Sequence, residues 1–357
     1  MSNLNRLRAK MAEAGIPALL VSNIANVKWL TGFTGSFGYA IVTPDQARFI
    51  TDSRYAIQSG EQVKDMPTSW FQSPVVVDEF LAAQVKDMGL SNISFEGSQV
   101  AYSTYESWKS QFPGVLLTGA PDIIGNLRMV KSPEEIAKIR EACGITDSCF
   151  AHVQRMIQPG VSEWDICMDI EFFIRRSGQE LAFEPVVVSG IRSARPHGKA
   201  TEKKLEVGDF VTMDFGAKVG GYCADITRTV VVGEATDRHR QVYAQVLRAQ
   251  LESMALMKPG VAASTVDAKA RAVLGELDLA QYFGHGLGHG LGSVVHDTGR
   301  MNATSKDVLE VGQVWTVEPG VYIPGFGGVR IEDDVVITPD GLEVLTKSPK
   351  ELLVLPG

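Results

Sequence analysis

A glycine-rich stretch holds half of the histidines in the chain. Residues 283–297 read FGHGLGHGLGSVVHD and carry His285, His289 and His296, three of six histidines in all. An imidazole that binds a metal or a reacting group must approach it closely, and glycine neighbours let the backbone come near. The alternative is a glycine-rich loop in which the histidines are incidental. Acidic residues elsewhere must decide between the two interpretations.

A first pair of carboxylates lies in VTMDFGAKVGGYCADITRTVVV, residues 211–232, which predicts a β-hairpin. A turn centred between Val219 and Gly220 would place Asp214 directly opposite Asp225, on the same face. Two like charges among apolar strands are unfavourable without a counter-ion, so this arrangement favours a bound cation. The alternative leaves one of the aspartates in a solvated turn.

A second pair lies in VWTVEPGVYIPGFGGVRIEDDVVI, residues 314–337. A hairpin turn over 324–327, centred near Gly325, would place Glu318 opposite Glu332. Arg330 precedes Glu332 by two residues and therefore points to the same side. Its guanidinium fork could hold a ligand carboxylate in place, or it could form an ordinary surface ion pair.

Together these residues suggest a metal site. Carboxylate oxygens combined with an imidazole suit Mn²⁺, Fe²⁺, Co²⁺ or Zn²⁺. Four carboxylates exceed the need of one catalytic ion and would neutralise two divalent ions, about 3.5–4 Å apart. Such a pair turns a bridging water into hydroxide near neutral pH, so the expected chemistry is hydrolysis.

The elements that must position these groups fall into two predicted domains, as expected for 357 residues. In residues 1–125, a predicted helix over 3–14 is followed by a strand in PALLVSN and by short strands over 28–55. A helix near 77–87 and a strand at NISFEG complete a small α/β domain. The helix over 3–14 should bury Leu4, Leu7 and Met11.

The second domain is predicted over 131–357, after a boundary near 121–132. Ser132 is a good N-cap, Pro133 suits the first helical position and Glu135 completes a capping box. The long helix that follows should stop at Gln158-Pro159-Gly160.

A weak internal repeat runs through this second domain. One predicted helix ends in MIQPGVSEWD, residues 156–165, and another ends in LMKPGVAASTVD, residues 256–267. Each is followed by a further helical stretch and then by an acidic hairpin. We therefore expect two related halves whose hairpins meet, with the site at their junction.

Composition excludes several other classes of function. The formal net charge of −8, without a basic run, argues against nucleic acid and against a polybasic membrane anchor. The longest apolar runs are strand-sized, and no transmembrane segment or secretory signal is visible. The four cysteines form no CxxC pair, which indicates reduced thiols in a cytoplasmic protein.

At this point the sequence resembles a known family. DFGAKVGGYCADITR at 214–228, GHGLGH at 284–289, VHD at 295–297, VEPG at 317–320 and RIED at 330–333 resemble the pita-bread metallopeptidases. These include the Xaa-Pro dipeptidases (prolidases), aminopeptidase P and methionine aminopeptidase. NVKWLTGF at 26–33 and TDSRY at 51–55 resemble the creatinase-like N-terminal domain. The implied fold is α+β, with a small α/β creatinase-like domain before a pseudo-symmetric pita-bread domain.

The resemblance implies a role for each matching position. Asp214 would chelate one metal ion, His289 and Glu318 would bind the other, and Asp225 and Glu332 would bridge both. Glu318 would also move protons between the attacking water and the leaving amine. The remaining roles are His296, His285 and His197 as catalytic or substrate-side groups, with His296 stabilising the tetrahedral intermediate, and Thr227 and Arg330 as supports of the ligands.

The resemblance also implies the substrate and cofactors. The separate N-terminal domain favours the proline-directed branch, and therefore short proline-containing peptides and a homodimer. Two divalent ions are expected, Mn²⁺ as the usual metal and Co²⁺ or Zn²⁺ as alternatives. Arg300, four residues after His296, could meet the carboxylate of an Xaa-Pro dipeptide. Otherwise Arg300 is a surface residue, and Arg54 or Tyr55 of the other subunit could recognise the substrate.

Three alternatives to a dipeptidase stay open at this point. Aminopeptidase P would release the first residue from longer Xaa-Pro peptides. A creatinase-like hydrolase of the same fold, or a scaffold without chemistry, would lack the full metal set, whereas all five ligand positions are filled in this sequence.

Overall fold

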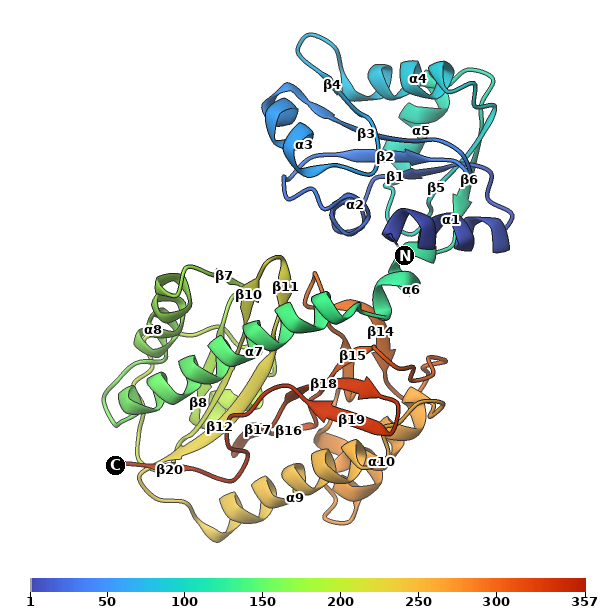
Figure 1. The fold of residues 1–357 in the computed structure, drawn as a ribbon. Coiled ribbons are helices and arrows are strands. Elements are labelled where there is room, and N and C mark those ends of the chain that lie inside the picture. Colours follow the sequence, from blue (N-terminus) through green and yellow to red (C-terminus); the bar gives the residue numbers. More distant parts are fainter. Residues whose placement is uncertain (1) are drawn as a thin grey trace. The chain divides into compact units, whose positions relative to one another are not determined.

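The computed structural model describes residues 2–357 and divides into two compact units, one ending at Arg128 and the other running from Met129 to Gly357 (Figure 1). The first unit is built on a mixed sheet with the strand order β4-β3-β2-β1-β5-β6. Its elements are α1 (Asn3–Glu13), β1 (Leu19–Val21), α2 (Ile24–Thr31), β2 (Tyr39–Val42), β3 (Ala47–Asp52), η1 (Ser53–Tyr55), α3 (Ala56–Gln62), β4 (Thr68–Phe71), α4 (Val77–Asp87), β5 (Asn92–Glu96), α5 (Tyr102–Gln111), β6 (Leu116–Ala120) and α6 (Ile123–Met129).

The N-terminal helix has the predicted apolar face, because α1 buries Leu4, Leu7 and Met11. The prediction of strand from residue 28 onward was wrong at its start, since residues 28–31 form the end of α2. Asn23 caps this helix by accepting hydrogen bonds from the backbone, and Gly32 ends it at a φ of 72°. The two caps, Asn23 and Gly32, flank the apolar residues of α2 and favour a helix there rather than a strand.

The second unit contains the remaining elements. They are α7 (Pro133–Val153), η2 (Gln154–Met156), α8 (Glu163–Arg176), β7 (Glu180–Leu181), β8 (Val186–Ser189), η3 (Gly190–Ala194), β9 (Phe210–Phe215), β10 (Ala217–Val219), β11 (Tyr222–Cys223), β12 (Ile226–Val232), α9 (Asp237–Met254), α10 (Ala263–Gly275), η4 (Ala280–Tyr282), β13 (Gly288–Gly290), β14 (Asp297–Met301), β15 (Val314–Val317), β16 (Gly320–Ile323), β17 (Gly327–Arg330), β18 (Asp333–Thr338), β19 (Gly341–Val344) and β20 (Val354–Leu355). Figure 1 shows α7 and α9 running along the outside of the strands.

Helix α7 begins as its sequence predicts. The Ser132 hydroxyl accepts a hydrogen bond from the backbone N–H of Glu135, the Glu135 carboxylate accepts one from the backbone N–H of Ser132, and Pro133 occupies the first turn. The α-helix ends at Val153, and a 3-10 turn carries the chain to the predicted stop at residues 158–160.

The repeat in the sequence corresponds to two similar halves. In the first half α7 and α8 precede the sheet β20-β12-β9-β8, and in the second half α9 and α10 precede the sheet β14-β13-β15-β18-β19. Each half has an apolar core. Residues of α7 and α8 pack on β9 and β12, and residues of α9 and α10 pack on β15 and β18. The bases of the two acidic hairpins, β9 with β12 and β15 with β18, belong to these sheets, and their tips form the small sheets β11-β10-β7 and β16-β17.

The predicted register of the first hairpin was wrong by two residues. Val219 pairs with Tyr222, so the turn is Gly220-Gly221, and Asp214 pairs with Thr227 rather than with Asp225. Both glycines have positive φ, 53° and 85°, which is the backbone that a tight two-residue hairpin turn requires. The shift is even, so Asp225 stays on the face of Asp214, one diagonal step along.

The register of the second hairpin is as predicted. Gly320 pairs with Arg330 in the β16–β17 hairpin, and Val317 pairs with Asp333 between β15 and β18. Both pairings have the same register, so Glu318 lies opposite Glu332 in the gap between them.

No helix within residues 2–357 is long and apolar enough to cross a membrane.

Candidate active site

A cavity of about 450 Å³ in the second unit collects the residues singled out by the sequence. Its acidic and basic lining comes from strands and from the loops beside them in both halves. The lining residues are Phe183, Glu184, Val186, Pro196, His197, Asp214, Asp225, His285, Gly286, Gly288, His289, Val295, His296, Arg300, Asn302, Glu318, Arg330 and Glu332. Of the predicted site residues, only Thr227 does not line this cavity, and it lies behind Glu332.

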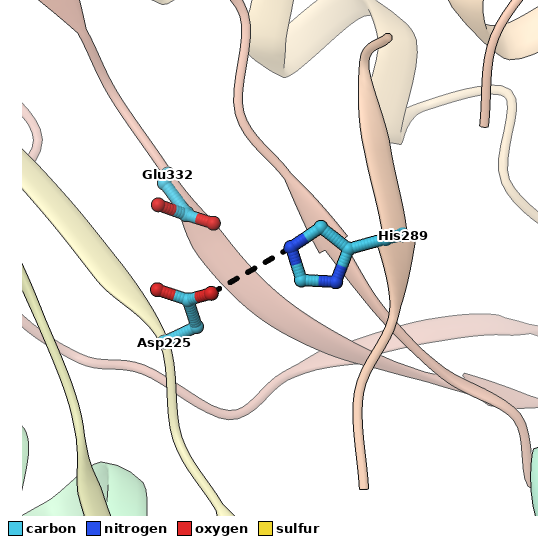
Figure 2. A group of neighbouring side chains, drawn as sticks. All are labelled: Asp225, His289 and Glu332. Carbon is cyan, nitrogen blue, oxygen red and sulfur yellow. Dashed lines mark ion pairs between the residues drawn. The ribbon is translucent and has the colours of Figure 1, made fainter. Parts of the chain in front are cut away.

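Three of these side chains form a tight group of possible metal ligands. One ligand atom each of Asp225, His289 and Glu332 lies within 4.8 Å of the others. Figure 2 shows the two carboxylates and the imidazole pointing toward one another from three separate segments. Asp225 immediately precedes β12, His289 lies in β13 and Glu332 immediately precedes β18, so both halves contribute.

The hydrogen bonds of His289 determine which ring nitrogen faces this group. Nδ1 lies 3.0 Å from the carbonyl oxygen of Gly290, which can only accept, so Nδ1 carries the proton. Burial lowers the pKa of His289 to about 4, so the ring is neutral at pH 7. The lone pair of Nε2 therefore faces Oδ2 of Asp225 at 3.7 Å and Oε1 of Glu318 at 3.4 Å.

Glu318 lies beside His289, and its carboxylate accepts a hydrogen bond from Thr316. The Thr316 hydroxyl donates to Oε1 of Glu318 over 3.3 Å and accepts from the backbone of His289 over 3.0 Å. Burial raises the pKa of Glu318 to about 8, against a lowering effect of Arg330. A carboxyl group with this pKa can hold and release a proton near neutral pH.

A chain of hydrogen bonds links the carboxylates of the two hairpins. NH2 of Arg330 donates to Oδ2 of Asp214 over 2.5 Å, and its Nε donates to the Thr227 hydroxyl over 2.9 Å. That hydroxyl donates onward to Oε2 of Glu332 over 2.5 Å. Arg330 is 3% exposed, so its ion pair with Asp214 is buried and does not lie on the surface. Arg330 and Thr227 thus fix the orientation of one carboxylate in each hairpin.

The clustered carboxylates lack enough positive charge and enough hydrogen-bond donors around them. Burial, together with the charges of neighbouring carboxylates, raises the pKa values of Asp225 and Glu332 well above the ordinary range. Among the described residues, Oδ1 of Asp214 and Oδ1 of Asp225 are buried without a hydrogen-bond partner. Buried acceptors of this kind are costly unless a cation satisfies them, so these residues fit divalent metal ions.

His285 has a different environment from His289. Its Nδ1 donates to the carbonyl of Gly286 over 2.8 Å, and its Nε2 lies 2.8 Å from the hydroxyl of Tyr322. That hydroxyl accepts from NH1 of Arg330 over 2.9 Å, so it donates to His285. Burial lowers the pKa of His285 to about 4, which agrees with a neutral ring. His285 is therefore held as a neutral group at the cavity wall.

The remaining predicted residues lie on the same cavity with more exposure. The ring of His296 packs edge-on against His289, with 4.5 Å between centroids, and burial lowers its pKa. His197 lines the cavity from the segment after η3. NH1 of Arg300 donates to the main-chain carbonyls of Asp297 and Gly299, each over 2.7 Å. Within residues 2–357 these two carbonyls are the hydrogen-bond partners of the Arg300 guanidinium, and no carboxylate pairs with it.

Several residues of the site were missed by the reasoning from sequence. Tyr322 lies four residues after Glu318 along the same hairpin, so strand alternation could have placed it on the same face. Asp334 accepts from the backbone of Asp225 over 2.8 Å, and it also directly follows the RIED motif. Phe183 and Asn302 line the cavity from irregular segments, and no local signal marks them.

Comparison with known proteins identifies the class to which this fold and site belong. The model of metallopeptidase family M24 matches residues 137–339, and that of the creatinase/prolidase N-terminal domain matches residues 3–130. The chain belongs to metallopeptidase family M24 and is a metal-dependent peptidase with a creatinase-like N-terminal domain.

Individual relatives are similar over nearly the whole chain. The uncharacterized peptidase YqhT of Bacillus subtilis is 41% identical over 353 residues, covering 99% of both chains. A solved Xaa-Pro dipeptidase from Bacillus anthracis is 41% identical with a TM-score of 0.95, covering 99% of both chains. A solved X-Pro aminopeptidase from Thermotoga maritima is 36% identical with a TM-score of 0.91, covering 99% of this chain and all of the other.

Proposed function

We propose that this peptidase hydrolyses the Xaa-Pro bond of short peptides, and Xaa-Pro dipeptides in particular, with two divalent metal ions. Asp214 would hold one ion, His289 and Glu318 the other, and Asp225 and Glu332 would bridge them. Mn²⁺ is the expected metal, with Co²⁺ or Zn²⁺ as alternatives. The alternative function is that of an aminopeptidase P, which acts on longer Xaa-Pro-Yaa peptides.

One observation carries the proposal for the metal ions. The unprotonated Nε2 of His289 faces carboxylate oxygens of Asp225 and Glu318 at 3.7 and 3.4 Å. All three atoms are electron-pair donors with no proton between them, which is the arrangement that a metal ion would satisfy. Arg330, whose fork is taken up by Asp214 and Thr227, supplies one positive charge beside four carboxylates. Two divalent ions would supply the charge that balances the cluster.

The side chains around this cluster are suited to hydrolysis. Divalent ions bound here would acidify a water molecule and polarise the scissile carbonyl group. Glu318, ionised once a metal ion is bound, would take the proton of the attacking water and pass it to the leaving nitrogen of proline. His296 would donate to the developing oxyanion, and His285 and His197 would orient the peptide.

The preference for dipeptides rests on Arg300. Its guanidinium lines the cavity, and NH1 is engaged only by main-chain carbonyls, so its charge is available to a substrate carboxylate. Arg54, the alternative group, already donates to both oxygens of Asp52 over 3.0 and 2.7 Å. A dipeptide ends one residue after the scissile bond, where Arg300 would meet its carboxylate.

A cleavage panel tests this function. The purified protein would be stripped with chelator, refilled with Mn²⁺, Co²⁺ or Zn²⁺, and offered Ala-Pro, Ala-Pro-Ala, Ala-Ala and Met-Ala-Ser, with products identified by mass. We expect cleavage of Ala-Pro and none of Ala-Pro-Ala. Release of alanine from Ala-Pro-Ala would instead identify an aminopeptidase P. Absence of cleavage with every metal would reject the proposal in both forms.

We further propose a homodimer in the cytoplasm. All four cysteines lie within the described chain, and each is buried with a free thiol, which is the state that a reducing compartment maintains. Light scattering of the purified protein would give the mass in solution, and 77 kDa, about twice the chain mass of 38.7 kDa, would support the dimer.

A further inference from the structure

Glu163 is a fully buried carboxylate that the proposed chemistry does not use. It is the first residue of α8, within the PGVSEWD stretch of the internal repeat, and its exposed fraction is 0%. Oε1 accepts from the backbone and the hydroxyl of Ser189 over 2.8 and 2.9 Å. Oε2 accepts from the backbone and the hydroxyl of Thr201 over 3.1 and 2.8 Å. One carboxylate therefore ties together both ends of residues 189–201.

Arg192 completes this attachment from inside the segment. Its Nε donates to both oxygens of Glu163, over 3.2 and 3.1 Å, and its NH2 donates to the carbonyl of Lys199 over 2.7 Å. The segment 189–201 carries Pro196 and His197, which line the cavity. The Pro196 carbonyl also accepts from NH1 of Arg330 over 3.2 Å. Glu163 thus accepts hydrogen bonds from both ends and from the interior of the segment that carries His197.

The second half of the unit repeats this device with other residues. Asp267 lies on α10 in the matching stretch PGVAASTVD, and its exposed fraction is also 0%. It accepts from the backbone of Leu287 over 3.1 Å and from Nε of Arg271 over 2.8 Å. Arg271 then donates to the main-chain carbonyls of Phe283 and His285 over 3.1 and 2.6 Å. A buried carboxylate and its arginine again hold a histidine-bearing segment.

We propose that Glu163 and Asp267 are positioning residues for the substrate side of the site, acting through His197 and His285 respectively. A buried carboxylate that accepts several hydrogen bonds fixes its donors within a few tenths of an ångström, whereas a free loop would let the histidines move. Neither carboxylate lines the cavity, so neither takes part in metal binding. This inference rests on the proposed Xaa-Pro hydrolysis for its kinetic test.

Glu163→Gln is the first variant. The NH₂ group of the amide would face the N–H and O–H donors of Ser189 or Thr201, and those hydrogen bonds would be lost. We expect KM for Ala-Pro to rise about tenfold, with the affinity for Mn²⁺ unchanged within about twofold. Asp165→Asn is the matched control. Asp165 lies in the same helical turn, is exposed, and contacts Ser162 and Lys204 rather than residues 189–201. Asp165→Asn should leave KM unchanged.

A double-mutant cycle with His197→Ala separates positioning from a general loss of structure. If Glu163 acts through His197, Glu163→Gln should cost little further activity in the His197→Ala protein. Multiplicative losses would overturn the inference, and so would an unchanged KM in the folded single variant. Arg192→Lys, which keeps the charge and loses the fork, is the milder second variant and should raise KM in the same direction.

The second half has its own matched pair. Arg271→Lys should raise KM and show the same lack of additivity with His285→Gln. Arg248→Lys is the control, because Arg248 forms exposed ion pairs with Glu252 and Glu276 away from residues 283–288. Equal effects of the two arginine variants would contradict a specific role for Asp267 and Arg271.

Hydrogen exchange keeps this inference distinct from the proposed function. In Glu163→Gln, backbone amides in 189–201 should exchange faster, while those in 283–288 keep their wild-type rates; Asp267→Asn should show the reverse. Unchanged exchange in both variants would reject the positioning role even for an active enzyme. Failure of the wild-type protein to cleave any peptide would reject the proposed function and leave the exchange result as the test of the two carboxylates.

Discussion

Arg330 and Asp214 form a buried ion pair between the two hairpins, with 2.5 Å between NH2 and Oδ2. The pair occupies one oxygen of Asp214 and leaves Oδ1 buried without a partner within residues 2–357. The rest of the Arg330 fork contacts Thr227, Tyr322 and the Pro196 carbonyl. Arg330 therefore turns Asp214 so that its open oxygen is available to a cation.

Arg330→Lys should lower Mn²⁺ affinity and kcat/KM by about 10- to 100-fold, because lysine keeps the charge but cannot donate to Asp214 and Thr227 together. Titration with Mn²⁺ and assays with Ala-Pro measure both quantities. Arg140→Lys is the control, since Arg140 forms an exposed pair with Glu343. Wild-type metal affinity in Arg330→Lys would show that the fork does not orient the ligands.

Asp225→Asn should abolish hydrolysis while the protein stays folded, because it removes a carboxylate proposed to bridge both ions. Metal content per chain and circular dichroism would be measured together. In the wild-type protein, Mn²⁺ at 100 times its dissociation constant should stabilise the fold by about 2.7 kcal/mol, and the variant should lose most of this. Full activity of Asp225→Asn would overturn the two-metal assignment. Asp87→Asn, in an exposed pair with Arg48, serves as the neutral control.

The metal-free protein should become less stable as the pH rises from 6.5 to 8. Burial raises the pKa of Glu318 from 4.5 to about 8, so its contribution to stability is complete below pH 4.5 and is lost as the pH rises toward 8. Burial lowers the pKa values of His285 and His289 from 6.5 to about 4, so their contributions are lost only as the pH falls below 6.5. Above pH 6.5 the effect of Glu318 remains, and the raised pKa values of Asp225 and Glu332 act in the same direction.

Urea unfolding in chelator at pH 6.5 and pH 8 measures this difference, to which Glu318 alone should contribute about 1–2 kcal/mol. Glu318→Gln cannot ionise and should reduce the dependence, leaving the part that Asp225 and Glu332 contribute. The same pKa values predict that Mn²⁺ binding at pH 7 releases protons, since a carboxyl group must ionise to bind a metal. An equal free energy of unfolding at both pH values would contradict the raised pKa.

Arg300→Met should lower kcat/KM for Ala-Pro by about 10- to 100-fold, because the charged hydrogen bond to the substrate carboxylate would be lost. Any residual activity on Ala-Pro-Ala should be much less affected, since its carboxylate lies one residue further on. Arg175→Met is the control, because Arg175 is exposed in the last turn of α8. A uniform loss on both peptides would argue against a carboxylate clamp and favour a structural role.

Local rules of sequence were sufficient where the signal and its consequence lie within a few residues. Ser132, Pro133 and Glu135 determine the start of α7, and the centre of the 324–327 turn places Glu318 opposite Glu332. Alternation along a strand puts Arg330 on the side of Glu332. These features depend on backbone geometry that neighbouring residues impose directly.

Other features were decided only by tertiary structure. The even shift in the first hairpin follows from two glycines that both adopt positive φ, and the Val219-Gly220-Gly221 run permits either turn centre. The contacts of Arg330 with Asp214, Thr227 and Pro196, and the attachment of residues 189–201 to Glu163, join segments from about 25 to over 130 residues apart. The sequence alone thus determined which chemical groups are present and in which turns and helices. The packing of the two halves decided which carboxylate and imidazole acceptors lie close together without a hydrogen-bond donor. This arrangement depends on distances across the fold and on the burial that raises or lowers each pKa.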